Sequence, residues 1–470
     1  MTTQNHPGPA RAKIPPQSHV KHPAQRLAQG KALREIATRK SQSEWQRPAD
    51  RADPVELLIE NSQGRLEELL PIRYGRMMAS PFTFYRGAAA IMAYDLAHTP
   101  ATGLHIMACG DCHLMNFGGF ATAERQIAFD INDFDEGSLA PWEWDIKRLA
   151  ASFVLAGRSN GFAESACREA AWTAVQSYRL RMAQYAEMPV LQVWYDFFDF
   201  NMLAEKAVTK EMRNFYLKKL ASATEQSHRE KEFARLAFQS GAAPRIIDQP
   251  PLIFHYGDER DQIMRAAMKK TLAAYKKTLI PARRILLDRF EPVDYAIKVV
   301  GIGSVGTICG IYLLMSGNGE PLFLQFKQAR RSVLEPYCGA SPFKHAGERV
   351  VMAQRTMQAA GDIFLGWTTG AGGADRHFYI RQLSDAKIKP VIEIMKEPNL
   401  INYGRFTGAA LARAHARSVD AALLTGYLGR STAFEDAVTN FAAAYADQTE
   451  RDHAKLLDAI RNGRIEARVE

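Results

Sequence analysis

Cys109-Gly-Asp-Cys-His-Leu-Met-Asn116, followed by Phe129-Asp-Ile-Asn-Asp-Phe-Asp135, is the most informative part of this sequence. The first segment places a carboxylate and a carboxamide five residues apart in a tight loop, and the second places further carboxylates at the end of a short strand. Carboxylate and amide oxygens suit a divalent cation, and a carboxylate beside it can activate a hydroxyl group. The pattern favours such chemistry, and a hydrogen-bonded turn rich in Asp and Asn is the alternative.

The two segments resemble the catalytic loop and metal-binding aspartate of aminoglycoside phosphotransferases and related small-molecule kinases. In that superfamily a Gly-Asp-x-His-x-x-Asn loop precedes an Asp-Phe-x or Asp-Trp-x metal site. Asp145 follows Asp133 by twelve residues, and in the kinases this second aspartate opens a helix and braces the catalytic loop. The resemblance implies that His113 also braces the loop. Cys109 stands where the family loop often has histidine.

The resemblance also implies roles for the acidic side chains. Asp111 would be the catalytic aspartate that accepts or orients the proton of the attacking hydroxyl. Asn116 and Asp133 would complete the catalytic set and hold magnesium, with Asp135 as a further metal ligand. Asp130 remains an alternative, because any of the three strand-end carboxylates could bind the ion.

A second motif, Gly301-Ile-Gly303-Ser-Val-Gly306, has the pattern G-x-G-x-x-G. In a dinucleotide-binding fold such glycines open a helix, but here the following residues favour a strand. The strand–glycine loop–strand hairpin resembles the lid that protein kinases lay over ATP, where side chains would obstruct the phosphates. A flexible turn is the alternative. The next strand, residues 321–327, ends at Lys327, where kinases keep the lysine that holds the α- and β-phosphates.

Lys327 would need an acidic partner on the next helix, for which Glu348 is the first choice and Glu335 the second. The strand over residues 379–383 would be the hinge that meets the adenine edge through its backbone. The predicted nucleotide-binding residues are therefore Gly301, Gly303, Ser304, Gly306, Lys327, Glu348, Gln382 and Leu383.

These parts stand in rotated order, because kinases place the glycine loop, lysine and hinge before the catalytic loop. The helix expected over residues 406–416 is similar to the one that precedes the catalytic loop in small-molecule kinases. We expect an α+β, two-lobed, protein-kinase-like fold that is circularly permuted and carries a helical insertion. The expected units are a flexible basic arm (1–53), a catalytic-loop lobe with the insertion (54–290), a glycine-loop nucleotide lobe (291–385) and C-terminal helices that complete the catalytic lobe (386–470).

Six segments are also similar to the bacterial domain of unknown function 2252, over roughly residues 50–460. They are Arg73-Tyr-Gly-Arg-Met, Ser80-Pro-Phe-Thr-Phe-Tyr-Arg-Gly-Ala, the loop at 109–118, Asn132-Asp-Phe-Asp-Glu, Pro141-Trp-Glu-Trp-Asp-Ile-Lys-Arg-Leu-Ala-Ala-Ser and Ala412-Arg-Ala-His-Ala-Arg-Ser. This family implies no substrate, so the functional expectation rests on the likeness to kinases.

The composition agrees with a folded chain of 470 residues, 47% hydrophobic and 24% charged. Residues 1–50 hold nine Lys or Arg and three Asp or Glu, which accounts for most of the net charge of +9. The body is nearly neutral, so nucleic-acid binding through the basic arm is an unlikely third function. The sequence has neither a secretory signal nor a long apolar run, which predicts a soluble cytoplasmic protein without membrane contact.

The remaining cysteines and aromatic residues carry structural expectations. Cys109 and Cys112 form a C-x-x-C pair, but no second pair would complete a zinc site, so reduced thiols are expected. Trp142 and Trp144 are expected in the core. Arg76 and Arg86 are expected to form ion pairs with acidic residues near the loop, and contact with a substrate or nucleotide phosphate is the alternative.

The sequence therefore predicts an ATP- and magnesium-dependent phosphotransferase that acts on a hydroxyl acceptor, either a small molecule or a protein. A pseudokinase or nucleotide-sensing module that binds without turnover is the alternative. The acceptor and the oligomeric state stay open.

Overall fold

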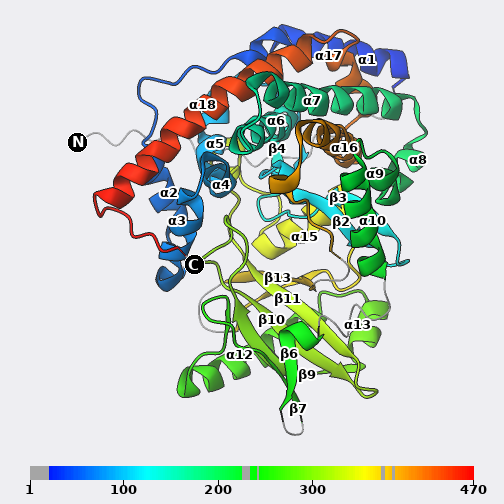
Figure 1. The fold of residues 1–470 in the computed structure, drawn as a ribbon. Coiled ribbons are helices and arrows are strands. Elements are labelled where there is room, and N and C mark those ends of the chain that lie inside the picture. Colours follow the sequence, from blue (N-terminus) through cyan, green and yellow to red (C-terminus); the bar gives the residue numbers. More distant parts are fainter. Residues whose placement is uncertain (1–20, 225–232, 241–242, 372–375, 384–386, 470) are drawn as a thin grey trace.

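The computed structural model describes residues 21–224, 233–240, 243–371, 376–383 and 387–469. The chain is a mixed α+β protein in which a helical layer lies against a layer of antiparallel sheet (Figure 1). Segments far apart in sequence meet in the helical layer, where the long C-terminal helix runs beside helices from the first third of the chain. The loop at 109–116 shares a cleft with residues of the sheet layer, such as Gln328 and Ala329 of β11.

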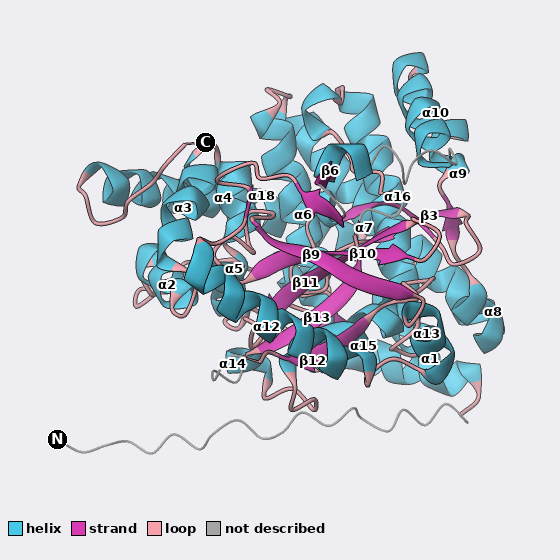
Figure 2. Cartoon of the chain, turned by 90° about the horizontal axis from the view of Figure 1, so that it is seen from below, coloured by secondary structure: helices cyan, strands magenta, loops and turns pink. Residues whose placement is uncertain are grey.

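The sheet layer has six antiparallel strands in the order β12-β13-β11-β10-β9-β8 (Figure 2). The strands are β8 (Ile253–Phe254), β9 (Phe290–Lys298), β10 (Cys309–Ser316), β11 (Pro321–Ala329), β12 (Gly366–Thr369) and β13 (His377–Gln382). Apolar side chains of α12 (Asp258–Lys276) pack on one face of this sheet, as Leu272 and Tyr275 do beside Tyr312 and Phe326. The sheet layer thus begins before the expected boundary at residue 290.

Local sequence signals explain these strands. A tight turn at 317–319, with the sequence Gly-Asn-Gly, joins β10 to β11, and Gly319 has a φ of 79°, which favours glycine. The glycine motif at 301–306 connects β9 to β10, which pair as antiparallel neighbours, so the predicted strand–loop–strand arrangement is confirmed. The register places Lys327 opposite Cys309 on one side and Tyr379 on the other.

The helical layer contains α6 (Trp142–Ser159), α7 (Glu164–Glu187), α16 (Glu397–Ala416), α17 (Ala421–Leu428) and α18 (Ala433–Arg461). Their apolar faces form the largest hydrophobic cluster of the described residues. Trp142 and Trp144 are both buried in this cluster, as predicted. Because α16 and α18 pack on α6 and α7, the C-terminal helices from residue 397 onward belong to the same layer as residues 142–187.

Shorter elements join the layers. They are β1 (His105–Ala108), β2 (Phe117–Ala121), β3 (Ile127–Ile131), β4 (Ser138–Pro141), β5 (Phe198–Asp199), α8 (Val190–Tyr195), α9 (Asn201–Glu205), α10 (Lys210–Thr224), the β6–β7 hairpin (Ala237–Ser240, Ala243–Ile246), α13 (Pro281–Leu287), α14 (Glu335–Cys338) and α15 (Ala346–Met357). β1 pairs with β4, and β2 pairs with β3, which also pairs with β5. The segment 145–290 is mostly helical as expected, although it also contains β5 to β8.

The N-terminal arm expected to be flexible over residues 1–53 is partly folded; residues 1–20 lie outside the described part. Helix α1 (Pro23–Ala32) crosses α17 at a close approach of two glycines. A Cβ on Gly30 would lie 1.8 Å from the Leu423 carbonyl oxygen, and one on Gly426 would lie 2.1 Å from that of Leu27. The prediction failed here because this contact uses small residues rather than an apolar stripe.

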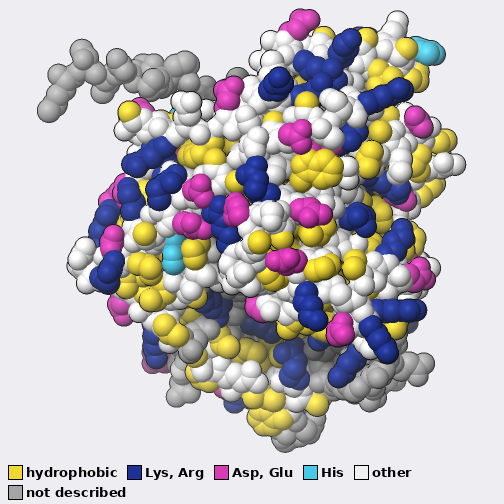
Figure 3. Space-filling view, turned by 45° about the horizontal axis from the view of Figure 1, so that its top comes forward, with side chains coloured by type: hydrophobic (Ala, Val, Ile, Leu, Met, Phe, Trp, Pro, Cys, Tyr) yellow, Lys and Arg dark blue, Asp and Glu magenta, His cyan; other side chains and the backbone are white. Residues whose placement is uncertain are grey.

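Several of the basic residues in this segment have partners inside the fold. Arg34 and Arg39 donate to the carbonyls of Tyr427 and Leu428 at the end of α17, at 2.8 Å in each case, and Arg26 forms an ion pair with Asp420 at 2.9 Å. On the face in Figure 3, Lys and Arg side chains alternate with Asp and Glu and form no continuous basic stripe. None of the described helices is both long and apolar enough to cross a bilayer.

Candidate active site

The loop after β1 is held from the protein interior by Asp145 of α6. Its carboxylate accepts hydrogen bonds from the backbone N–H of Cys109, at 2.6 Å, and of Gly110, at 2.9 Å. The same carboxylate lies 3.2 Å from His415 Nε2 of α16, and His415 Nδ1 lies 2.9 Å from the Tyr178 hydroxyl of α7. Asp145 therefore braces this loop as predicted, and it links the loop to the C-terminal helices.

Gly110 is required for the shape of this loop. Its φ is 79°, and an added Cβ would lie 2.6 Å from the Glu136 carbonyl oxygen. A side chain at this position would be both strained and obstructed.

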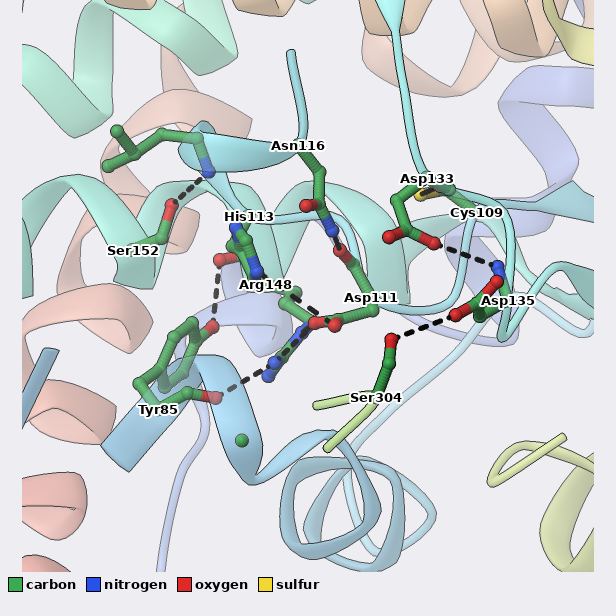
Figure 4. A network of polar contacts seen from close by, with 12 residues as sticks. Tyr85, Cys109, Asp111, His113, Asn116, Asp133, Asp135, Arg148, Ser152 and Ser304 are labelled. Carbon is green, nitrogen blue, oxygen red and sulfur yellow. Dashed lines mark hydrogen bonds and ion pairs between the residues drawn. The ribbon is translucent and has the colours of Figure 1, made fainter. Parts of the chain in front are cut away.

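Asp111 stands at the centre of the site and is paired with Arg148 of α6 (Figure 4). Arg148 reaches Asp111 Oδ1 through Nη2, at 2.6 Å, and Nε, at 2.8 Å, and it stacks on the Tyr85 ring at 4.3 Å from the ring centroid. Burial raises the pKa of Asp111, and Arg148 opposes that rise. The carboxylate keeps one-fifth of its surface, 21%, exposed.

Asn116 and His113 support the same loop. Asn116 Nδ2 donates to the Asp111 carbonyl at 2.8 Å, which leaves the carboxamide oxygen of this cleft-lining residue for another partner. His113 is buried, and its Nε2 lies 3.9 Å from Asp111 Oδ2. Burial, together with Arg86 and Arg148, lowers the pKa of His113 well below its ordinary value, so this ring is neutral at pH 7.

The two acidic side chains after β3 differ in their surroundings. Asp135 accepts from Lys327 Nζ at 2.6 Å, from the Tyr379 hydroxyl at 2.6 Å and from the Ser304 hydroxyl at 3.1 Å. Burial works against the ionised form of Asp135, but Lys327 and Tyr379 outweigh it and lower the pKa to about 2.

The Asp133 carboxylate has fewer hydrogen-bond donors than that of Asp135. Its Oδ1 accepts only the Asp135 N–H, at 3.1 Å, and its Oδ2 lies 3.8 Å from Lys327. Burial and repulsion from Asp135 raise its pKa. With 33% of its side chain exposed in the cleft, Asp133 is the more available of the two carboxylates.

Lys327 has different acidic partners from those expected. It pairs with Asp135 and, more distantly, with Asp133, which raise its pKa well above the ordinary value although burial opposes them. Glu335 instead accepts the Ser332 N–H and lies 3.7 Å from Arg349. Glu348 makes no ion pair with Lys327 among the described residues.

The neighbouring residue on α15, Arg349, takes the inward position. Its guanidinium is buried and donates to the carbonyls of Asp135, at 2.8 Å, Arg330, at 2.9 Å, and Gly137. The sequence did not show that residue 349, rather than 348, points inward. Successive residues of a helix are about 100° apart, so Glu348 lies about 100° away from the inward face.

Asp130, the alternative metal ligand, lies away from the cleft. Its carboxylate is fully buried and accepts from Nη2 of Arg413 of α16 through Oδ1, at 2.7 Å, and Oδ2, at 2.6 Å. It also accepts the Ala359 N–H at 2.8 Å. Position in the chain explains the difference, since Asp130 belongs to β3, whose residues are all buried, and Asp133 and Asp135 follow the end of that strand.

The glycine loop covers the cleft and is held from outside by arginines. Arg65 donates to the carbonyls of Gly303 and Val305, both at 2.7 Å, and Arg76 donates to the carbonyl of Gly301. A Cβ on Gly303 would lie 3.9 Å from Asp111 Oδ2, so the loop lies directly over the catalytic-loop aspartate. Arg76 thus contacts the loop backbone.

A cleft with a volume of about 130 Å³ lies between the two loops. The sequence-predicted residues on its wall are Asp111, Asn116, Asp133, Asp135, Gly301, Gly303 and Ser304. Lys327 reaches it through Asp135. Gln382 and Leu383 do not line it, and their N–H groups donate to Asp362, at 2.6 Å, and to the Phe323 carbonyl, at 2.9 Å.

Three contributors to the site were missed in the sequence. Arg148 lies three residues after Asp145 on one helix face, a spacing that could have indicated it. Tyr379 could have been found as the cross-strand neighbour of Lys327 once the register was known. Nothing in the sequence pattern connects Arg65 with a loop more than 200 residues later.

A magnesium ion would fit the oxygen atoms of this site. The described residues contain no group of three or more His, Cys, Asp or Glu side chains able to hold a metal, so no complete protein cage is present there. Asn116 Oδ1 and Asp133 together offer the one or two protein oxygens that magnesium uses when phosphates and water supply the others. These residues therefore suit a nucleotide-dependent ion.

The comparison with protein families gives one match. The family described as "Uncharacterized protein conserved in bacteria (DUF2252)" matches residues 65–459, which include both loops. No curated protein and no solved structure matches the chain.

Proposed function

Since the chain belongs to the DUF2252 family, we propose that this fold is an ATP- and magnesium-dependent phosphotransferase with a circularly permuted, kinase-like arrangement. The observation that carries the proposal is the convergence of two motifs on one cleft. Asp111, Asn116 and Asp133 form one wall, and the glycine loop with Ser304 forms the other. Both motifs resemble kinase parts, and each contributes to the cleft from a separate part of the chain.

Two further contacts support the permuted order. Asp145 accepts the backbone N–H groups of the catalytic-loop segment, as the corresponding aspartate does in kinases. Helix α16, which resembles the helix before the kinase catalytic loop, reaches that loop through His415 although it lies some 300 residues later in the chain. Both contacts support a kinase-like arrangement in which the chain is cut at a different place.

In the proposed reaction the residues act mainly by positioning and by charge. Asp111 Oδ2 faces the glycine loop and is free to accept the proton of an acceptor hydroxyl, because Arg148 holds Oδ1. Asn116 and Asp133 would hold magnesium, which supplies neutralisation of phosphate charge when bound. Lys327 would neutralise further phosphate charge from the sheet side.

Asp135 serves in this proposal as the positioning residue for Lys327 rather than as a metal ligand. Three donors already occupy its carboxylate, and its low pKa, about 2, reflects the charge of Lys327. Asp135 is thus the acidic partner that holds Lys327 in place, a role expected for Glu348 or Glu335.

Nucleotide binding tests the proposal directly. We expect ATP analogues to raise the thermal midpoint of the protein only when magnesium is present, because the ion needs both the phosphates and Asp133. Asp133→Asn should remove the magnesium dependence. Asp199→Asn, a conservative change outside the cleft, should leave it unchanged. A wild-type protein that no nucleotide stabilises would contradict the proposal.

The Asp111–Arg148 ion pair favours a second candidate, a module that binds nucleotide without turnover, because the arginine reduces the basicity of the carboxylate. Phosphate release from radiolabelled ATP separates the two. Turnover by the wild type that Asp111→Asn abolishes, with nucleotide binding intact, indicates the phosphotransferase. Equal binding with no turnover by either protein indicates the sensing module.

A further inference from the structure

An excess of positive charge lies along one wall of the cleft. Arg65, Arg86 and Arg330 line this wall, and Arg73 lies buried directly behind it. None of these four arginines has a carboxylate within ion-pair distance in the part of the chain that the structure describes. Buried or half-buried cations without an anionic partner are unusual, because leaving water costs them more than backbone contacts return.

Three of the arginines donate to uncharged groups. Arg65 contacts the Gly303 and Val305 carbonyls at 2.7 Å, Arg330 contacts the Asn61 and Gln63 carbonyls at 2.8 and 2.7 Å, and Arg73 contacts the Ser62 hydroxyl at 3.0 Å. These contacts fix the guanidinium groups in place without cancelling their charge. A preorganised cationic wall results.

Carboxylates of the described residues act on the wall only from beyond ion-pair distance: Asp111 and Glu393 on Arg86, and Glu136 on Arg65 and Arg330. Asp111 is engaged by Arg148, and Glu136 accepts the Val333 N–H at 2.8 Å but lies beyond ion-pair distance of the arginines. Burial and repulsion from Arg73 and Arg330 lower the pKa of Arg65 well below its ordinary value, and Glu136 offsets this only in part.

Arg86 is the member of the wall best placed to meet a ligand. Its side chain makes no hydrogen bond to any described residue, and its Nε is buried without a partner. Its own carbonyl lies 3.5 Å from where a Cβ of Gly303 would stand, next to the approach to Asp111 Oδ2. The ion pair expected for Arg86 is therefore absent, which leaves an anion as its natural partner.

We propose that the acceptor is a small molecule that carries a compact anionic group, phosphate or carboxylate, bound by Arg86 in front of Arg65 and Arg330. This inference rests on the phosphotransferase proposal, since it concerns the acceptor side of the same cleft. The anion would place a hydroxyl of the same molecule beside Asp111, with Arg86 as a forked donor. Arg86, Arg65 and Arg330 line the same cleft as Asp111, so the anionic group and the reacting hydroxyl can belong to one small molecule.

The full chain can be titrated with inorganic phosphate and, separately, with acetate, by calorimetry with and without a saturating non-hydrolysable ATP analogue and magnesium. We expect at least one anion to bind in both conditions, and the stronger one identifies the acceptor group. Arg86→Gln should weaken binding at least tenfold, and Arg86→Lys should weaken it less because the charge remains. Arg213→Gln, the same change on the exposed face of α10, should have no effect.

The outcomes separate the two proposals. If the nucleotide analogue displaces the anion competitively, the arginines belong to the nucleotide phosphates and the acceptor inference is overturned. If the nucleotide binds normally and neither anion binds at millimolar concentration, the acceptor inference fails while the phosphotransferase proposal stands. If an anion binds but no nucleotide does, the phosphotransferase proposal fails, and the acceptor role falls with it. Equal binding by wild type and by folded Arg86→Gln also overturns the inference.

Discussion

The two loops that face each other across the cleft are held in opposite ways. The loop at 109–116 is fixed from the interior, where the buried Asp145 carboxylate accepts its backbone N–H groups and connects to His415. The loop at 299–308 is held from the half-exposed side, where Arg65 and Arg76 bind its carbonyls. One wall of the cleft is therefore braced by a buried carboxylate, and the other is held by arginine side chains together with the buried Val305.

The largest expected effect comes from breaking the interior support. Asp145→Asn replaces a charged acceptor by a carboxamide, whose NH₂ group would face the N–H groups of Cys109 and Gly110. We therefore expect a loss of about 3 kcal/mol in the free energy of unfolding. Urea denaturation measures it. Asp447→Asn is the matched control, because this exposed carboxylate pairs with Arg158 at the surface and should cost less than about 1 kcal/mol. Equal losses of unfolding free energy in the two variants would show that the interior carboxylate does not support its loop more strongly than a surface ion pair.

A glycine from each loop sharpens the comparison. Gly110 and Gly301 have φ values of 79° and 70°, so alanine strains both by about 1 kcal/mol. At Gly110 the new Cβ would also meet a carbonyl oxygen at 2.6 Å, whereas at Gly301 the nearest atom is Ser304 Oγ at 3.8 Å. We expect Gly110→Ala to cost clearly more than Gly301→Ala in the same denaturation assay. A larger cost at Gly301 would show that its loop is the more tightly packed.

The ion pair that joins the segment after β3 to the sheet depends on pH through Asp135. Its pKa is lowered to about 2, so its ion pair with Lys327 stabilises the fold above the ordinary aspartate pKa near 3.9. That contribution is lost as the pH falls from about 4 toward 2. The stability difference between wild type and Asp135→Asn, measured by denaturation at each pH, should shrink over this range. A difference that stays constant would exclude the ion pair as its source.

The smallest effect on stability is expected at the arginine support. Arg65→Gln shortens a side chain that binds two carbonyls, and the loop at 299–308 should exchange its amide hydrogens faster while overall stability falls by about 1 kcal/mol. Hydrogen exchange followed by mass spectrometry resolves this segment. The loop at 109–116 serves as the internal reference, and faster exchange there would show that both loops share one support.

The two loops also differ in how well their sequence predicted them. The β9–β10 hairpin and the bracing role of Asp145 are local or closely spaced signals, and the structure confirms both. The local sequence pattern did not predict which side chains from distant segments would pair. Asp135 rather than Glu348 pairs with Lys327, because the strand end and the sheet meet only in three dimensions.

Burial decided the other differences. Asp130 resembles its neighbours in the sequence, yet Arg413 draws it into the core, and only the fold shows this. Residues 21–53 have few apolar side chains, so composition indicated a flexible arm, although glycine contacts and arginine caps hold part of that segment on α17. The roles of Asp111, Asn116 and Asp133 in chemistry stay predictions until nucleotide is tested.

The crossing of α1 with α17 has a consequence for how the chain is made. Gly30 and Gly426 meet at van der Waals distance, so the first described helix has no partner until the ribosome has added almost 400 further residues. Contacts this distant in sequence form late, because loop closure must precede them. During synthesis α1 would remain undocked and open to proteases or chaperones, and its docking would mark the completion of the helical layer.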